Sequence, residues 1–346
     1  MVQWRYNSCL RGDIGSVCSV CWSWDGKFIV SGSADETVRL WDPNTYQEVA
    51  CFRGHSGIVN CVSWSADGRF IASSSDDRSI RIWDANSRNQ ISCLLGHTDC
   101  VKSVSWSADG RLVVSGSNDE TLRVWEVSNG REILRLQGTN NKVTSVSWSG
   151  DGKMIASGSE DGTIRIWEAS SGSEMTCLEG HTHSVTCVSF SADSKMIASG
   201  SHDNTVRIWE VQGGRQMSCC EGHTHVVTSV SWSGDARMIA SSSWDKTLRI
   251  WEVVTGKRIW YLRGHASGVS CVSWSWNGRV IASGSWDRTI KIWQGILWVR
   301  SPKRVSINWR EWLSKKRRRG RAGSDNEDGD AEEMKGQLQS GKRMRA

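Results

Sequence analysis

Serine, histidine and aspartate recur in this chain at a spacing that could support nucleophilic catalysis. His55, Ser73 and Asp77 are the residue types of a hydrolase triad. A triad, however, needs one exposed nucleophile beside an oxyanion-binding site. Four more copies of the set follow, each with a tryptophan six residues after the aspartate, and this repetition favours structural hydrogen-bond networks over a catalytic centre. The five sets are His55, Ser73, Asp77 and Trp83; His97, Ser115, Asp119 and Trp125; His181, Ser199, Asp203 and Trp209; His223, Ser241, Asp245 and Trp251; and His265, Ser283, Asp287 and Trp293.

The tryptophans of these sets belong to a longer series with a period of 42 residues and no insertion or deletion. Each has an aspartate six residues before it and a serine ten residues before it. A period of this length indicates a repeat architecture, so residues 1–299 are predicted to form one cooperative domain. Residues 300–346 lack the period and are predicted to form a separate charged tail. The series consists of Trp41, Trp83, Trp125, Trp167, Trp209, Trp251 and Trp293.

One repeat, residues 55–96, shows the pattern of four short strands. The segments 55–65, 70–74, 79–83 and 89–95 have strand patterns, and the tight turn at 66–69 and the loops at 76–78 and 84–88 separate them. The second strand is largely apolar, as expected for a central strand covered on both faces. Four strands of this length cannot bury both faces alone, so neighbouring repeats must stack.

The repeat boundaries carry a recognisable signature. Gly54-His55 near the start and Trp83-Asp84 near the end resemble the WD-repeat (β-transducin-like) family, and the resemblance covers residues 4–293. It implies an all-β fold, a seven-bladed β-propeller of four-stranded antiparallel blades around a central channel. The resemblance also implies that each Asp–His–Ser–Trp set is a hydrogen-bond chain that ties three strands of a blade together.

Ring closure can be predicted from the chain itself. Residues 5–10 align with the fourth-strand segment 47–52 and precede the first set of three strands. The N-terminal strand is therefore predicted to complete the blade that ends at Trp293, which removes exposed sheet edges. The alternative closing segment, 299–304, contains Pro302 and a dense positive charge and is less favourable.

Two repeats depart from the signature, and a basic residue recurs in all seven. Asp13 and Thr139 occupy the histidine position in the first and fourth repeats. Asp13 would place a second carboxylate beside Asp35, which costs free energy. A lysine or arginine lies two residues before each repeat tryptophan. It either pairs with a local carboxylate such as Asp67, or belongs to a basic ring for nucleic acid; the neutral body of the chain favours local pairing.

Composition narrows the class of protein. Residues 1–299 hold 29 basic and 30 acidic residues, and residues 300–346 hold 14 and 7. No apolar run is long enough for a membrane helix and no signal-peptide core is present, which predicts an intracellular protein in the nucleus, the cytoplasm or both. Eight of the twelve cysteines occupy two repeat positions, alternate with Val and Ser, and are expected to be small buried residues in strands. No cofactor and no metal site is predicted.

A partner site is predicted on one face of the ring. Propellers of the family often bind peptides on the face of the Gly-His loops. The residue before each blade aspartate and the residues just after the histidine position would lie there, with charge in repeats two to four and aromatic groups in repeats five to seven. The alternative is that each indole covers only its own hairpin. The predicted partner-binding residues are His202, Val226, Trp244 and Trp286.

The tail has features of a localisation signal. Val305, Trp309, Trp312 and Leu313 are spaced for a short helix within 305–316. A basic run resembles a nuclear localisation signal, although such runs also contact phosphate nonspecifically. Acidic and basic blocks follow and predict disorder. The cations of the run are Lys315, Lys316, Arg317, Arg318, Arg319 and Arg321.

Two functional classes remain, and neither is an enzyme. No phosphate-binding loop, metal-ligand spacing or unrepeated nucleophile–base set occurs. The first class is a non-catalytic scaffold, a monomeric propeller that binds protein or peptide segments within a larger complex and has no membrane partner. The alternative is a nuclear RNA- or DNA-associated factor, in which the tail binds phosphate and the propeller recruits partners.

Overall fold

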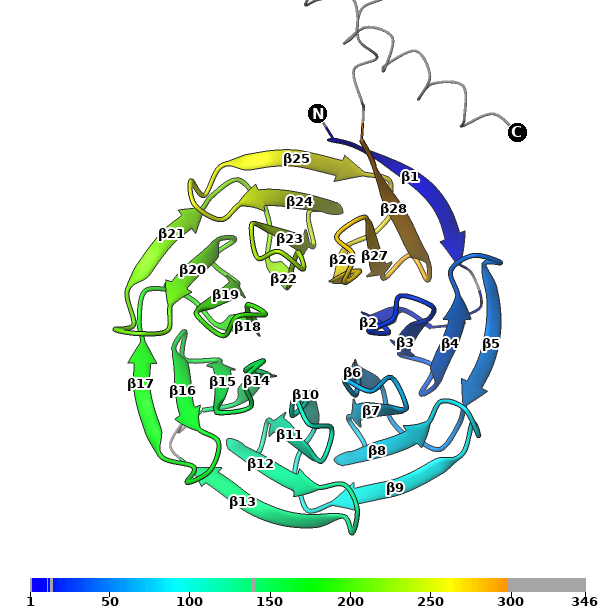
Figure 1. The fold of residues 1–346 in the computed structure, drawn as a ribbon, viewed down its shortest axis with the longest axis vertical. Helices are drawn as coiled ribbons and strands as arrows, with labels where there is room; N and C mark the ends of the chain where they lie inside the picture. The colour runs from blue at the N-terminus through cyan, green and yellow to red at the C-terminus, as the bar shows by residue number, and fades with distance from the viewer. Residues whose placement is uncertain (1, 11, 13–14, 138–140, 298–346) are drawn as a thin grey trace, which may run out of the picture. The chain divides into compact units, whose positions relative to one another are not determined.

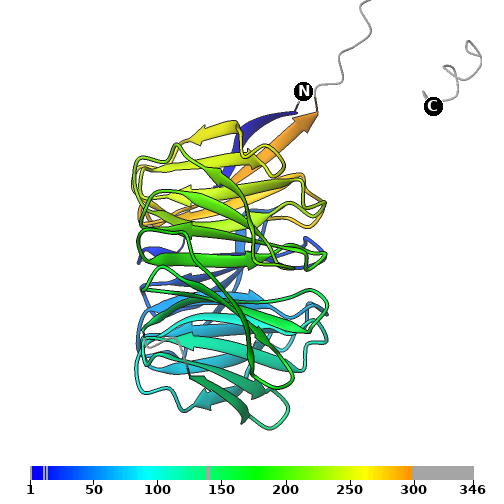
Figure 2. The same ribbon diagram turned by 90° about the vertical axis from the view of Figure 1, so that its left-hand side faces the viewer.

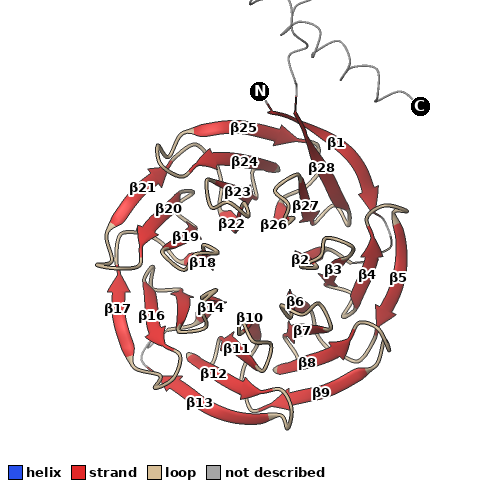
Figure 3. Ribbon diagram, viewed as in Figure 1, coloured by secondary structure: helices blue, strands red, loops and turns tan. Residues whose placement is uncertain are grey.

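The computed structural model describes residues 2–10, 12, 15–137 and 141–297 of the chain. Within them, twenty-eight strands form seven separate four-stranded antiparallel sheets. The sheets are arranged as blades around a central axis (Figure 1), and the described residues contain strands and loops only (Figure 3). The predicted all-β, seven-bladed propeller is therefore confirmed.

Each blade uses four strands that are consecutive in the chain, except the last. Blade one contains β2 (Val17–Trp22), β3 (Ile29–Ser33), β4 (Val38–Asp42) and β5 (Gln47–Phe52). Blade two contains β6 (Val59–Trp64), β7 (Phe70–Ser75), β8 (Ser79–Asp84) and β9 (Gln90–Leu95). Blade three contains β10 (Val101–Trp106), β11 (Leu112–Ser117), β12 (Thr121–Glu126) and β13 (Arg131–Gln137).

The next three blades repeat this arrangement. Blade four contains β14 (Val143–Trp148), β15 (Met154–Ser159), β16 (Ile164–Glu168) and β17 (Glu174–Leu178). Blade five contains β18 (Val185–Phe190), β19 (Met196–Ser201), β20 (Val206–Glu210) and β21 (Gln216–Cys220). Blade six contains β22 (Val227–Trp232), β23 (Met238–Ser243), β24 (Thr247–Glu252) and β25 (Arg258–Arg263).

Blade seven joins the two ends of the ring. It consists of β26 (Val269–Trp274), β27 (Val280–Ser285), β28 (Ile290–Leu297) and the N-terminal strand β1 (Val2–Leu10), in the order β1-β28-β27-β26. β1 pairs with β28 from Val2↔Leu297 to Leu10↔Ile290, and Figure 1 shows the two strands side by side. The prediction that the N-terminal strand closes the ring is confirmed, and the alternative segment 299–304 lies outside the described residues.

The core lies between blades rather than within them. Val59, Val62 and Ile71 of blade two pack with Val30 and Leu40 of blade one in a cluster of buried side chains. The second strands are buried along almost their whole length, which explains their apolar sequences. In five of the seven blades a glycine in the second strand lets adjacent blades approach, because a methyl group there would crowd a valine of the next blade. At Gly32, for example, an added Cβ would lie 2.7 Å from Val59 Cγ1.

The ring has two faces, which are made by different loops. On one, the loop after the fourth strand meets the loop between the second and third strands, as in the bond from Asp76 N to Ile58 O at 2.9 Å. On the other, the turn between the first two strands meets the loop between the third and fourth, as in the bond from Ala85 N to Arg69 O at 3.0 Å. We call these the Gly-His face and the hairpin face. Figure 2 shows the ring edge-on, with loops on both sides.

Candidate functional site

The residues of the repeated set meet as a continuous side-chain chain in five blades. The distances from His Nδ1 to Asp Oδ2 are 2.7–2.9 Å, and those from His Nε2 to Ser Oγ are 2.7–2.8 Å. The tryptophan Nε1 donates to the same serine Oγ at 2.8–2.9 Å. The structure thus brings together all twenty residues of the sets that the sequence singled out.

The chemistry of the groups fixes the direction of the bonds. The Asp77 carboxylate can only accept, so Nδ1 of His55 carries the proton and Nε2 accepts. Ser73 therefore donates its hydroxyl proton to His55 and accepts the indole N–H of Trp83. Each polar atom in this buried chain has a partner, as burial demands.

This geometry resembles a hydrolase triad but lacks access. Ser73 is 0% exposed and the His55 side chain is also 0% exposed. The indole N–H of Trp83, on the third strand of the blade, donates a hydrogen bond to the serine oxygen. A nucleophile that touches no solvent cannot reach a substrate. The sets instead link the loop before β6 to strands β7 and β8.

Burial and hydrogen bonding set the charge states of the chain. Burial alone would raise the pKa of Asp77, but hydrogen bonds from Ser79 and His55 outweigh it and hold the pKa at about 2. Burial lowers the pKa of His55 below its usual value, and the neighbouring Asp77 only partly offsets this. At neutral pH the carboxylate is therefore charged and the imidazole neutral, which is the state that the bond directions require.

Blades one and four use a different partner for the aspartate. Asp13 and Thr139 lie outside the described residues, but Trp41 and Trp167 still donate to Ser31 and Ser157, each at 2.9 Å. Arg39 Nη1 lies 2.8 Å from Asp35 Oδ2, and Arg165 Nη1 lies 3.3 Å from Asp161 Oδ2. In blades three, five and six, where histidine is present, the same pair is 3.6–3.9 Å apart. An arginine thus approaches the carboxylate most closely where the sequence lacks the imidazole.

The repeated basic residues are engaged within their own blades, but not by the carboxylate that the sequence suggested. Arg81 Nη1 donates to Gln90 Oε1 at 2.5 Å, and Arg123 Nη1 pairs with Glu132 at 2.7 Å. Both acceptors lie at the start of the fourth strand, the cross-strand neighbour of the arginine strand. Asp67 instead accepts the Arg69 main-chain N–H within its turn. The local interpretation holds, the suggested partner Asp67 is wrong, and these arginines do not form a free basic ring.

An aromatic cluster crosses the Gly-His face from blade five to blade seven. The ring centroids of Trp244 and Trp286 are 5.1 Å apart, and those of Trp244 and His202 are 5.8 Å apart. His225 also lies against Trp244, at 5.3 Å. Trp286 is 45% exposed, and both histidines are exposed. We refer to His202, His225, Trp244 and Trp286 as the aromatic cluster.

Two details of this surface differ from the sequence expectation. Val226 is only 5% exposed, and its main-chain oxygen accepts from Trp244 N at 3.1 Å. His225 takes the outward place and was missed; its only signal is that it follows the histidine of the set by two residues. At Gly268 an added Cβ would lie 3.3 Å from Trp244 Cδ1 and 3.5 Å from Trp286 Cε3, so glycine lets this loop lie close to both indoles.

The charged residues of repeats two to four on the same face, which we call the charged arc, form ion pairs with one another. Lys102 Nζ lies 2.8 Å from Asp76 Oδ1, and Lys142 Nζ lies 3.6 Å from Glu160 Oε2. These pairs are partly exposed and contribute little net free energy. The apolar aromatic cluster is therefore the more distinctive part of the face.

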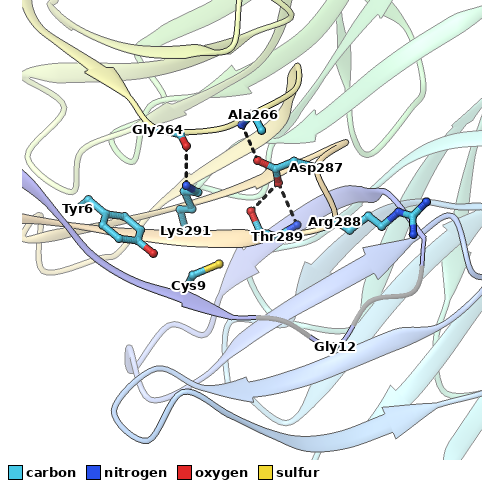
Figure 4. A pocket seen from close by; sticks show the side chains of 9 residues that line it. All are labelled: Tyr6, Cys9, Gly12, Gly264, Ala266, Asp287, Arg288, Thr289 and Lys291. Carbon is cyan, nitrogen blue, oxygen red and sulfur yellow. Dashed lines mark hydrogen bonds between the residues drawn. The ribbon is translucent and has the colours of Figure 1, made fainter.

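A polar pocket of about 450 Å³ lies at the seam between blades seven and one (Figure 4). Two of its charged groups already have partners: Lys291 Nζ donates to Gly264 O at 2.6 Å and lies 5.0 Å from the centre of the Tyr6 ring. Asp287 accepts from Ala266 N and Thr289 N, and it also belongs to the blade-seven set. The pocket is a consequence of ring closure rather than a built ligand site.

Other chemistry has no visible basis in the part of the chain that the structure describes. In these residues no group of three His, Cys, Asp or Glu side chains is placed to hold a metal ion. The twelve cysteines are all free thiols, but of the eight expected to be buried only Cys187 and Cys271 are; Cys177 is exposed and the other five are half-buried. Burial raises the pKa of Cys187 to about 11. No helix among the described residues is long and apolar enough to cross a membrane. The basic run 315–321 and the helix expected at 305–316 lie outside the described residues.

Comparison with known families agrees with the geometry. The model of the WD domain, G-beta repeat, matches residues 4–42, 46–84, 88–126 and 256–294. The model of the second β-propeller of echinoderm microtubule-associated proteins matches residues 111–262. No curated protein matches the chain. The matched repeats and the seven closed blades place the chain in the WD-repeat β-propeller family.

Proposed function

We propose that the protein is a non-catalytic scaffold that holds peptide segments of partner proteins on its Gly-His face. WD-repeat propellers are in general protein-interaction modules. The single observation that carries the proposal for this chain is the aromatic cluster. Two adjacent indoles flanked by two exposed histidines provide rigid apolar area with polar edges, the composition of an interface hot spot.

The repeats themselves support this interpretation of the tryptophans. The five other positions equivalent to Trp244 and Trp286 hold Ala34, Asp76, Asn118, Glu160 and His202. The blades that hold these five residues fold in the same way without an indole at that place. The tryptophans of blades six and seven are therefore dispensable for blade formation and available for a partner.

Replacing both tryptophans should remove binding without unfolding the ring. We expect the double variant Trp244→Ala, Trp286→Ala to melt close to the unmodified protein, yet to recover at least one partner tenfold less in quantitative affinity purification from cells. Loss of two hot-spot indoles accounts for an effect of at least this size. The matched control is the pair Asn118→Ala, Glu160→Ala on the charged arc, which should leave recovery unchanged. Equal partner profiles for both double variants would exclude the aromatic cluster as the binding site.

A second proposal concerns localisation and rests on the distribution of charge. Residues 1–299 are close to neutral, whereas residues 300–346 hold 14 basic and 7 acidic residues. Six cations within residues 315–321 suit either the acidic groove of an import receptor or the phosphates of nucleic acid. We propose that this run directs the scaffold to the nucleus, and that a nucleic-acid contact there is the alternative use of the same cations.

The tail can be tested apart from the propeller. Fused to a fluorescent cargo protein, residues 300–346 should cause nuclear accumulation, and replacing the six cations of 315–321 by alanine should abolish it. A salt titration of RNA binding, with and without residues 300–346, measures the alternative contact. Cytoplasmic cargo in both fusions would rule out the nuclear proposal and leave the scaffold proposal intact.

A further inference from the structure

The hairpin face carries a second candidate surface, a cleft between blades one and two. It has a volume of about 300 Å³ and combines side chains of both blades. Its walls come from the turn between β2 and β3, from β4 and β5, from the end of β6 and from the loop between β8 and β9. The residues that matter for the argument are Phe28, Leu40, Val49, Trp64, Ala85 and Arg88.

A small side chain, Ala85, lines the cleft where three other blades have a larger residue. Ala85 occupies the position that is Val127, Val211 and Val253 in blades three, five and six. Those valines pack into the cores between their own blades and the preceding ones. At the interface of blades one and two the missing methyl groups leave space above Phe28 and Val49. The apolar floor is thus open to a side chain from outside.

The rim carries a cation that its backbone position does not favour. Arg88 has a φ of 61°, a left-handed conformation, and four equivalent positions hold Gly130, Gly172, Gly214 and Gly256. Its side chain is exposed and makes no ion pair with any residue that the structure describes. The other rim charges, Lys27 and Asp25, lie 3.0 Å apart and neutralise each other. The cleft therefore offers an apolar floor beside one uncompensated positive charge.

A buried donor in the wall lacks an acceptor. Nε1 of Trp64 has no hydrogen-bond partner within the described residues. In blades three and six the equivalent indoles of Trp106 and Trp232 donate to main-chain oxygens of the preceding blade, at 3.1 and 3.0 Å, whereas those of Trp22 and Trp274 also lack a partner among the described residues. Buried N–H groups are normally satisfied, so a carbonyl oxygen brought into the cleft would supply what the wall lacks.

The surface continues beside the cleft onto exposed indoles. Trp24 belongs to the turn that forms the wall, and its ring centroid lies 3.9 Å from that of Trp276 in blade seven. The two side chains are 52% and 46% exposed. The equivalent positions in blades two to six hold only alanine or glycine, so these indoles are not needed to build a hairpin. Stacked, half-exposed indoles of this kind are typical of binding surfaces.

We propose that this cleft binds an extended segment of a partner protein that presents an apolar side chain next to a carboxylate. The apolar side chain fills the space above Phe28 that Ala85 leaves open, and the carboxylate pairs with Arg88. A main-chain carbonyl satisfies Trp64, and the segment then runs over the Trp24–Trp276 pair. The site lies on the face opposite to the aromatic cluster, so the protein can hold two partners at once without competition.

The repeats supply substitutions that the fold already accepts. Ala85→Val installs the residue of blades three, five and six and fills the cleft. Arg88→Gly installs the residue of four other blades and removes the charge. The matched control is Ala169→Val, the same change at the equivalent position of blade four, whose loop does not line the cleft. All three full-length variants should melt within a few degrees of the unmodified protein.

The probe is a phage library of random twelve-residue peptides, selected on the full chain carrying Trp244→Ala and Trp286→Ala. Selected peptides are synthesised and measured by fluorescence anisotropy. We expect sequences that converge on an apolar residue beside Asp or Glu, bound at least tenfold more weakly after Ala85→Val or Arg88→Gly and equally well after Ala169→Val. Lack of convergence, convergence on basic sequences, or affinities that neither cleft variant changes would overturn the proposal.

Discussion

Removal of residues 1–10 is expected to open the ring and to leave an aggregation-prone protein that unfolds with reduced cooperativity. β1 supplies the fourth strand of blade seven and pairs with β28 along its whole length. Without it β28 becomes an unpaired edge, which can add strands from other molecules. The deletion also removes Trp4 and Leu10, which are 7% and 1% exposed. Burial of two such side chains contributes about 1.5–3 kcal/mol each.

The test combines chemical denaturation with size-exclusion chromatography of the deleted protein. A synthetic peptide of residues 1–10, added in excess, should restore the unfolding midpoint in a concentration-dependent manner, because binding to the native state stabilises it. Arg5→Ala is the control, since Arg5 lies exposed on the same strand. A truncated protein that unfolds like the full chain would show that β1 does not close the ring in solution.

The period made most of the fold predictable. Because 42 residues recur without insertion, one correctly interpreted repeat gives all the blades, and the alignment of residues 5–10 with residues 47–52 gives the closure. The interblade contacts also follow, since an apolar second strand must be covered on both sides. The period gives no information about residues that are unique to one repeat, so their contacts could not be predicted in this way.

The predicted partner site on the Gly-His face is one example. Spacing places residues 225 and 226 on the correct loop, but it does not determine which of the two turns outward. In the structure Val226 is buried and His225 is exposed, whereas Ile58, which makes the equivalent main-chain bond in blade two, is 38% exposed. The cleft of blades one and two was equally hidden, since Ala85 looks unremarkable until its neighbours across the interface are known.

The partners of the basic residues illustrate the same point for electrostatics. Asp67 is fourteen residues before Arg81, and Gln90 is nine residues after it, so sequence distance alone does not choose between them. The antiparallel register places Arg81 opposite Cys93 and Trp83 opposite Gln90, and the long Arg81 side chain reaches along the fourth strand to Gln90. Meanwhile the tight turn uses the Asp67 carboxylate for its own main chain.

In the second large prediction, Trp83→Ala and Trp167→Ala should each lower the free energy of unfolding by about 3–5 kcal/mol. Both indoles are 3% exposed, so both substitutions leave a large cavity in the core between blades. Each also removes a donor to a buried serine. Blade two has the complete Asp–His–Ser–Trp chain, whereas blade four lacks its histidine. The free-energy cost of the cavity dominates in both blades, so the two losses should be similar.

Serine substitutions measure the free-energy contribution of the hydrogen-bond chain separately from that of the cavity. Ser73→Ala deprives both His55 Nε2 and Trp83 Nε1 of their partner, and each unsatisfied buried group costs about 1–3 kcal/mol. Ser157→Ala deprives Trp167 alone of a side-chain partner among the described residues. The two serines are equally buried, at 0% and 1% exposure, and both changes remove a single oxygen.

Ser73→Ala should therefore lower the free energy of unfolding by about 1–3 kcal/mol more than Ser157→Ala does. Asp35→Ala removes one of two carboxylates that pair with the buried Arg39, and Glu48 Oε2 at 3.2 Å from Arg39 Nε remains. Urea denaturation of the four single variants and the two tryptophan–serine double variants completes a pair of thermodynamic cycles. A loss for Ser73→Ala no larger than the loss for Ser157→Ala would mean that the histidine bond of the Asp–His–Ser–Trp chain adds nothing beyond packing, while the two cycles measure the tryptophan–serine bond in each blade.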